Sequence, residues 1–267
     1  MGLAYQLLLY KFLHHKKKNS IKKLCCDKTI MPINSYIIFG YYDFIQIRKI
    51  TKMYDFLNLE INKVADISGF KFENIIPYEG RNYSHFLTEK HKNFPFVLIT
   101  YIKLKNNKIK NNSKKLEENT KNKYMKLIFN HFGWSNYIVL TFFKDISEIS
   151  LILEHLNTSF EILHSISYLG IDYNLENAKK NCITSDKKIN IISFLRSLEY
   201  KKNKQLFENF FKDEMQTNNF FYLIGRYDYI FDKSLNSIEF LEYVNKILDF
   251  AAEKKDIEKI TSHIRFT

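Results

Sequence analysis

The chain has few cysteines, prolines and glycines: three, three and seven among 267 residues. Cys25 and Cys26 are adjacent and Cys182 stands alone, a pattern that offers neither a disulfide framework nor paired zinc ligands. No apolar run approaches the roughly 20 residues that a membrane-spanning helix needs. The apolar N-terminal stretch precedes its basic residues, whereas a secretory signal peptide has the reverse order. We therefore expect a cytoplasmic protein with no membrane partner.

The motifs of common enzyme chemistry are missing as well. The sequence contains no Walker loop, Rossmann glycine pattern, nucleophile elbow or zincin motif, so nothing in it specifies phosphate, dinucleotide or acyl-transfer chemistry. His85 and His91 are six residues apart, which suits neither a helical metal pair nor neighbouring strand positions. We expect a protein that is not an enzyme and has no metal and no cofactor.

The net charge of +12 is concentrated in two lysine-rich segments. Lys11 to Lys28 carries +6 and Lys103 to Lys126 carries +7, so the remaining residues together carry −1. Lysine stands beside asparagine in these runs and arginine is scarce, which favours a solvated surface over a binding groove. The alternative is a phosphate-binding patch. Its candidate contacts are Lys16, Lys17, Lys18, Lys108, Lys110, Lys114 and Lys115.

One short pattern occurs three times, as Gly40 to Asp43, Gly133 to Asn136 and Gly225 to Asp228, at spacings of 93 and 92 residues. Each copy places Asp or Asn three positions after a glycine and lies between two strand-like segments, which predicts a hairpin. The strand predicted after the second copy is Tyr137 to Phe143. A helix with an apolar stripe follows each copy, near residues 53–64 in the first, and Asn236 with Glu239 predicts a capping pair in the third. An alternating strand comes next, and in the second copy it places Ile162 and Tyr168 on one face. A further strand and helix precede the second and third copies, with the first of these helices near residues 114–123.

This order, β-α-β-β-α-β, predicts an α+β fold built from tandem ferredoxin-like units with antiparallel sheets. The predicted units span residues 1–90, 91–180 and 181–267. The apolar stretch Leu3 to His15 predicts a helix at the start of the first unit, so we predict an incomplete unit (αββαβ) that lacks its first strand. The sheet edge left open would suit strand addition by another chain.

The second unit resembles the effector-binding domain of the Lrp/AsnC regulators through Gly133 to Asn136, Asp145 to Asn157 and Ser165. The third unit is similar through Gly225 to Asp228, Asn236 to Phe250 and Ser262. In that family, domains of the dimeric α+β barrel type pair sheet to sheet, and small effectors, often amino acids, lodge between them. The resemblance implies a role in binding or assembly.

The second unit departs from the family pattern at its hairpin. Trp134 and Ser135 stand where acidic and aromatic residues are usual, and Asn136 replaces the usual Asp. The family's helix-turn-helix is not recognisable, so operator binding is not implied. The hairpin tips are the candidate ligand or partner contacts: Tyr41, Asp43, Trp134, Asn136, Arg226 and Asp228.

These observations predict a non-enzymatic regulatory or scaffolding protein that binds a small effector, a protein partner or a second copy through sheet faces or an edge. The alternative is a single-stranded RNA or DNA binder that uses the lysine-rich segments, similar to CRISPR-associated proteins with tandem ferredoxin-like units. An effector site predicts an apolar pocket between units with a few polar groups. A nucleic-acid site predicts exposed rings on a sheet with basic side chains nearby.

Overall fold

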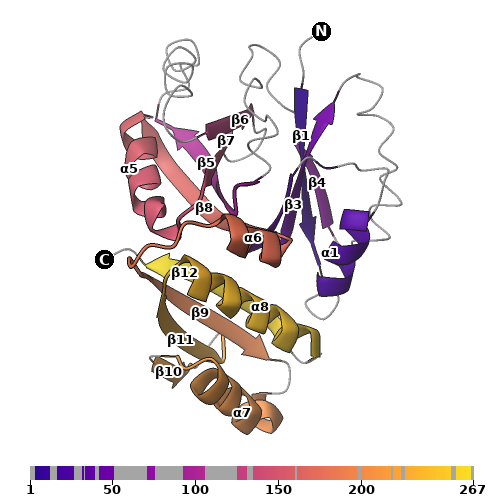
Figure 1. Cartoon of the computed structure of the whole chain (residues 1–267), viewed down its shortest axis with the longest axis vertical. Coiled ribbons are helices and arrows are strands. Elements are labelled where there is room, and N and C mark those ends of the chain that lie inside the picture. The colour runs from indigo at the N-terminus through magenta and orange to yellow at the C-terminus, as the bar shows by residue number, and fades with distance from the viewer. Residues whose placement is uncertain are drawn as a thin grey trace.

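The computed structural model describes residues 4–12, 17–26, 32, 34–39, 42–50, 71–75, 93–105, 125–130, 135–159, 161–197, 200–217, 219–223, 226–253 and 257–265. In these residues twelve strands form an eight-stranded sheet and a four-stranded sheet, and every pairing within them is antiparallel (Figure 1). The helices that the sequence predicts near residues 53–64 and 114–123 lie outside the described residues.

The strands form three groups of four with one shared spatial order. In each group the first and third strands along the chain pair with each other, and the second and fourth strands flank them. The first unit contains β1 (Ala4–Lys11), α1 (Lys17–Cys26), β2 (Asn34–Phe39), β3 (Phe44–Ile50) and β4 (Lys71–Ile75), arranged β4-β1-β3-β2. The second contains β5 (Phe96–Leu104), β6 (Met125–Asn130), β7 (Tyr137–Phe143), η3 (Ile146–Glu148), α5 (Ile149–Ser159) and β8 (Ile162–Asp172), arranged β8-β5-β7-β6.

After the linking helix α6 (Leu175–Asn181), the third unit repeats the order as β10-β11-β9-β12. It contains β9 (Ile189–Ser197), α7 (Tyr200–Glu208), η4 (Asn209–Glu214), β10 (Asn219–Tyr222), β11 (Tyr229–Leu235), α8 (Ser237–Glu253) and β12 (Ile257–Arg265). The α+β, antiparallel fold class is confirmed. The unit boundaries stay predictions, and the strands of each group lie within the predicted ranges.

The prediction that the first unit lacks its first strand is wrong. Ala4 to Lys11 form strand β1, which pairs with β3 on one side and β4 on the other, where the sequence suggested a helix from Leu3 to His15. Leu7 and Leu9 pack on one face of the sheet while Leu8 and Tyr10 pack on the other. A strand buried on both faces reads as an unbroken apolar run, which periodicity cannot distinguish from a buried helix. The position that the sequence left without a strand is therefore occupied by β1.

The first two units are joined into one sheet by β2 and β8, which pair from Tyr36 opposite Asp172 to Phe39 opposite Leu169. Gly170 lies in this junction, and a Cβ there would come within 2.6 Å of Val97 Cγ1. The two halves diverge from the junction in Figure 1, and their inner faces share one buried cluster. Its residues are aliphatic or aromatic, with Leu7, Ile45 and Ile47 from one half and Ile99, Ile138 and Leu140 from the other.

Strand β8 contains a bulge, so the set of side chains that faces the inner core changes part-way along the strand. The pairing partner of Lys103 is His164 and that of Leu104 is Ile162, so Leu163 has no partner and forms a bulge. Ile162 consequently packs with the outer core and Tyr168 with the inner one. The predicted alternation, which placed both on one face, is wrong because a bulge reverses the order of faces.

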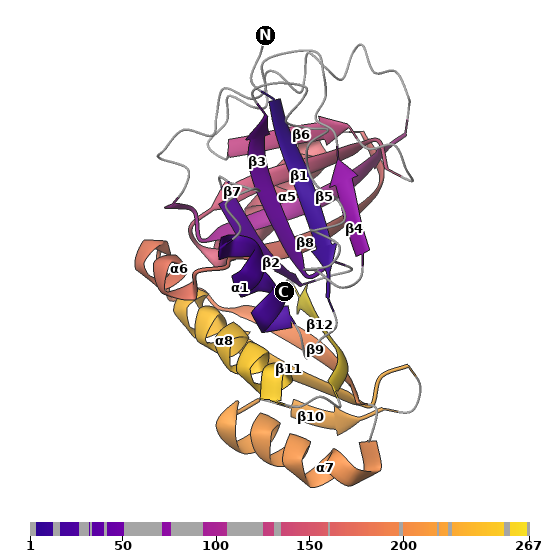
Figure 2. The ribbon, with the colours of Figure 1, turned by 90° about the vertical axis from the view of Figure 1, so that its right-hand side faces the viewer.

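The third unit shares a core with the second and contacts the first. Phe240 of α8 lies 6.4 Å from Phe96 and 6.2 Å from Phe39, measured between ring centroids. Helix α8 lies against α6 and α1 (Figure 2). Asn236 and Glu239 form the predicted capping pair at its start, because each backbone N–H donates to the other side chain, at 2.9 Å and 3.0 Å. No helix among the described residues is long and apolar enough to cross a membrane.

Candidate functional site

The Asx residue of each hairpin holds the end of its unit's first strand. The backbone N–H groups at these strand ends donate to the three side chains: Phe12 to Asp43 at 2.9 Å, Leu104 to Asn136 at 2.9 Å, and Ser197 to Asp228 at 2.7 Å. The Asx N–H groups donate back to carbonyl oxygens two residues earlier, on Tyr10, Ile102 and Leu195. The repeated pattern in the sequence thus marks a repeated clamp between hairpin and strand.

Three of the other predicted contact residues lie among the described residues: Lys17, Lys18 and Arg226. Lys17 is buried and its Nζ lies 3.1 Å from Asp43 Oδ1, so this lysine pairs within the first unit. Lys18 is exposed and forms an ion pair with Asp249 of the third unit. Arg226 is exposed, and its guanidinium lies 5.9 Å from the ring centroid of Tyr227. The remaining candidates lie outside the described residues: Tyr41, Trp134, Lys16, Lys108, Lys110, Lys114 and Lys115.

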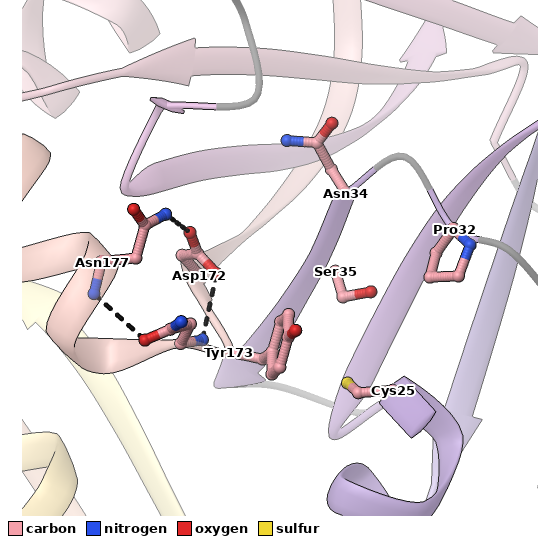
Figure 3. Close-up of a pocket in the computed structure, with 8 residues that line it drawn as sticks. Cys25, Pro32, Asn34, Ser35, Asp172, Tyr173 and Asn177 are labelled. Atoms are coloured by element: carbon pink, nitrogen blue, oxygen red, sulfur yellow. Dashed lines mark hydrogen bonds between the residues drawn. The ribbon is translucent and has the colours of Figure 1, made fainter. Parts of the chain in front are cut away.

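A polar pocket lies where the first two units join, and we call it the seam pocket (Figure 3). Its volume is about 260 Å³. Strand β2, the end of β8, the end of α1 and the start of α6 supply its walls. The eight lining residues are Cys25, Pro32, Asn34, Ser35, Asp172, Tyr173, Asn174 and Asn177.

Asp172 is the charged residue of this wall. Its carboxylate accepts hydrogen bonds from the backbone N–H of Asn174 at 3.0 Å and from Asn177 Nδ2 at 2.8 Å. Burial raises the pKa of Asp172, and these hydrogen bonds only partly oppose that effect. Because a carboxylate offers about four acceptor positions, two donors leave room for a ligand. No other member of the eight lining residues is charged.

The neighbouring ionisable groups are held in their neutral forms. Burial, with smaller effects from Cys26 and Asp172, raises the pKa of the Cys25 thiol to about 12. Burial and then Asp172 raise the pKa of Tyr36, whose hydroxyl accepts a hydrogen bond from Asn34 Nδ2 at 3.0 Å. A thiol with so high a pKa is a poor nucleophile at neutral pH. The pocket is built to accept hydrogen bonds and to attract positive charge.

A second pocket of about 340 Å³ lies in the third unit between β11 and α8. Three lysines line it, and burial followed by the charge of Lys246 lowers the pKa of Lys233. Two of these lysines have partners inside the third unit: Lys233 Nζ donates to the Met215 carbonyl, and Lys188 pairs with Glu239 at 3.4 Å. This pocket contains both cations and carboxylates, whereas the seam pocket has a carboxylate and no cation among its eight described lining residues.

None of the eight residues of the seam pocket was among the candidates predicted from the sequence. The sequence did contain a feature that indicates this site. Asp172, Asn174 and Asn177 are polar residues where a strand ends and the next helix begins. Asn174 caps that helix, since its side chain accepts from the N–H of Asn177 at 3.1 Å. The pocket also differs from the apolar site expected between units, since the space between the two halves of the eight-stranded sheet is filled by side chains of both halves.

No protein-family model matches the chain, so the Lrp/AsnC resemblance has no support from a family model. No curated protein matches it either. One solved structure, of a proposed chlorite dismutase, is similar with a TM-score of 0.44 and 14% sequence identity. The similarity covers 68% of this chain and 100% of that one.

Proposed function

We propose that this is a non-enzymatic regulatory protein whose seam pocket binds a small molecule with a protonated amine. The observation that supports this is the Asp172 carboxylate, which is 9% exposed, faces a pocket and has no cation among the eight described residues that line it. A ligand ammonium would offset the cost of burying that charge and could donate to its open acceptor positions. Asn34, Ser35 and Asn174 provide further polar contacts for orientation.

The position of the pocket suggests how a ligand could act on the protein. Asn34 and Ser35 belong to the first unit, and Asp172 belongs to the second. The backbone N–H of Tyr173 donates to the Ser35 carbonyl at 3.2 Å beside the pocket, so the two units already meet there. A ligand that contacts both units binds more tightly when the units are paired beside the pocket than when they are separated there. It therefore shifts the protein towards the paired state by that difference in binding free energy. An effector role in the manner of the Lrp/AsnC family remains part of this proposal.

Two further elements belong to the proposal. The high pKa of the Cys25 thiol supports binding over nucleophilic catalysis at this site. A cytoplasmic location is supported by the state of the cysteines in the described residues, since Cys25, Cys26 and Cys182 are all free thiols.

Two matched probes test the proposal: L-serinamide, which carries an ammonium group, and N-acetyl-L-serinamide, which is neutral. We expect L-serinamide to raise the melting temperature of the protein and to give a binding isotherm by calorimetry, while the neutral probe does neither. Asp172→Asn should abolish the response. Asp186→Asn makes the same chemical change at an exposed position outside the pocket and should preserve it. Equal responses to both probes, or an unchanged response in Asp172→Asn, would contradict the proposal.

A further inference from the structure

The sheet of the third unit has one face covered by helices and one face open among the described residues. Helices α7 and α8 lie on one side of this sheet (Figure 1). Buried Ile191, Leu195 and Phe231 join the core that contains residues of α7, η4 and α8, so they lie on that covered face. The alternate residues Ile192, Phe194 and Ile230 are half-buried. We call this second side, which also includes Arg196, Phe221 and Asp232, the open face.

The open face differs from the corresponding faces of the first two units, which pack against each other. The repeated hairpin clamp aligns the strands, so Asp232 of β11 corresponds to Ile47 of β3 and Leu140 of β7. Ile47 and Leu140 are both fully buried. Asp232 is half-buried, and its carboxylate accepts from the Asn219 N–H at 2.9 Å. A carboxylate at this position makes the face unsuitable for burial against another apolar sheet.

The open face carries two aromatic rings, on either side of an isoleucine, in one row across three paired strands. Phe221 of β10 pairs with Ile230 of β11, which pairs with Phe194 of the central strand β9. Phe221 is 58% exposed, and its strand β10 is an end strand of the four-stranded sheet (Figure 2). The ring of Tyr227, in the hairpin, lies 5.3 Å from that of Phe194. Rings on the central strands and beside them can stack with bases in single-stranded nucleic acids, because every base has a π-face.

Positive charge accompanies these rings. Arg226 is exposed and lies 5.9 Å from the Tyr227 ring centroid. Arg196 is exposed and lies two residues after Phe194, on the same face of β9. Guanidinium groups bind phosphates through paired donors and also stack on rings. The two guanidinium groups stand against one carboxylate among the described residues of this face, Asp232, whose oxygens already accept hydrogen bonds from Asn219. This local excess of positive charge favours a polyanion over a second copy of the same face.

We propose that the open face binds single-stranded nucleic acid, with bases stacked on Phe194 and Tyr227 and phosphates held by Arg196 and Arg226. This inference is independent of the seam pocket, which lies at the junction of the other two units. It uses arginines of the third unit instead of the lysine-rich segments on which the sequence-based alternative rested.

The test is fluorescence anisotropy of the full chain with labelled oligo(U) and oligo(dT) of twelve nucleotides, measured across a series of salt concentrations. Arg196→Gln with Arg226→Gln should weaken binding and reduce the slope of log K against log salt by about 0.7 per arginine. Lys180→Gln with Lys187→Gln removes the same charge at exposed positions before β9 and should leave the slope nearly unchanged. A preference for oligo(U) would identify RNA as the ligand, and one for oligo(dT) would identify DNA.

Phe194→Leu keeps apolar volume in the sheet and removes the stacking surface, so affinity should fall by at least about fivefold. Circular dichroism confirms that each variant is folded. Ultraviolet crosslinking followed by mass spectrometry should place the crosslink on peptides containing Phe194 or Tyr227, even if one variant is unstable. The inference is overturned if both charge variants behave alike, if crosslinks fall elsewhere, or if ultracentrifugation shows that a second copy covers this face.

Discussion

At the scale of single residues, Asp172 influences the other ionisable groups at the seam pocket. Its charge contributes to the raised pKa values of Cys25, Tyr36 and Tyr173. Its own pKa is raised by burial, so the folded protein carries an unfavourable charge at neutral pH. Binding sites often retain such a cost because the complementary ligand removes it. The stability of the unliganded protein should reveal that cost.

Asp172→Asn is therefore expected to stabilise the unliganded protein at pH 7, by about 0.5–2 kcal/mol. The folded pKa lies above the unfolded one, so the cost of ionisation is full above the folded value and absent below the ordinary carboxyl pKa of about 3.9. The gain should shrink toward zero as pH falls through this window, as measured by urea unfolding at several pH values. Asp186→Asn serves as the exposed control. A destabilised variant, or a gain that grows in acid, would contradict this account.

At the scale of elements, the hairpin clamp explains why a short pattern returns at nearly constant spacing. Each Asx side chain accepts the N–H at the end of the first strand, where regular pairing stops. The second unit achieves this with Asn136 and the others with Asp, so the bond requires an acceptor oxygen and no negative charge. The three units therefore allow Asp and Asn to be compared at the same position within one chain.

Asp228→Ala should destabilise the protein by about 1–3 kcal/mol, since the N–H of Ser197 loses its acceptor in a half-buried setting. Asp228→Asn should cost much less, because Asn136 fills the equivalent position in the second unit. Urea unfolding measures both, and hydrogen exchange at the Ser197 amide should be faster in the alanine variant alone. Equal costs for the two variants would show that charge, and not the acceptor, is what matters.

Sequence patterns predicted most elements well because their cause is local. The residues Tyr137 to Phe143 form β7 as predicted, and Asn236 with Glu239 cap α8. The errors arise where packing between distant segments decides. β1 looks like a helix because both its faces are covered, and the seam pocket depends on β2 meeting β8, about 130 residues later. Asp172 could be seen as a polar strand end, but its desolvation could not be predicted from its neighbours in sequence.

At the scale of the whole molecule, one buried side chain connects the second and third units. Ser237, at the start of α8, is fully buried, and its hydroxyl donates to Asp145 Oδ1 at 3.0 Å. Ser237 Oγ in turn accepts a hydrogen bond from the backbone N–H of Ile146 at 3.0 Å. Burial of Asp145 acts to raise its pKa, but hydrogen bonds from Ser185, Ser147 and Ser237 outweigh this and lower it. The contact is therefore strongest when Asp145 is ionised.

Ser237→Ala should destabilise the protein by about 1–3 kcal/mol at pH 7, because it leaves the Ile146 N–H without an acceptor and removes a donor from a carboxylate. The Asp145 pKa is lowered on folding, so its contribution is present above the ordinary carboxyl value and is lost as pH falls through the folded one. The effect should accordingly diminish in acid. Hydrogen exchange should quicken in α8 before the central strands β5 and β7, since the third unit loosens first. Ser150→Ala, an exposed position on α5, is the matched control, and equal losses in both variants would refute this role for Ser237.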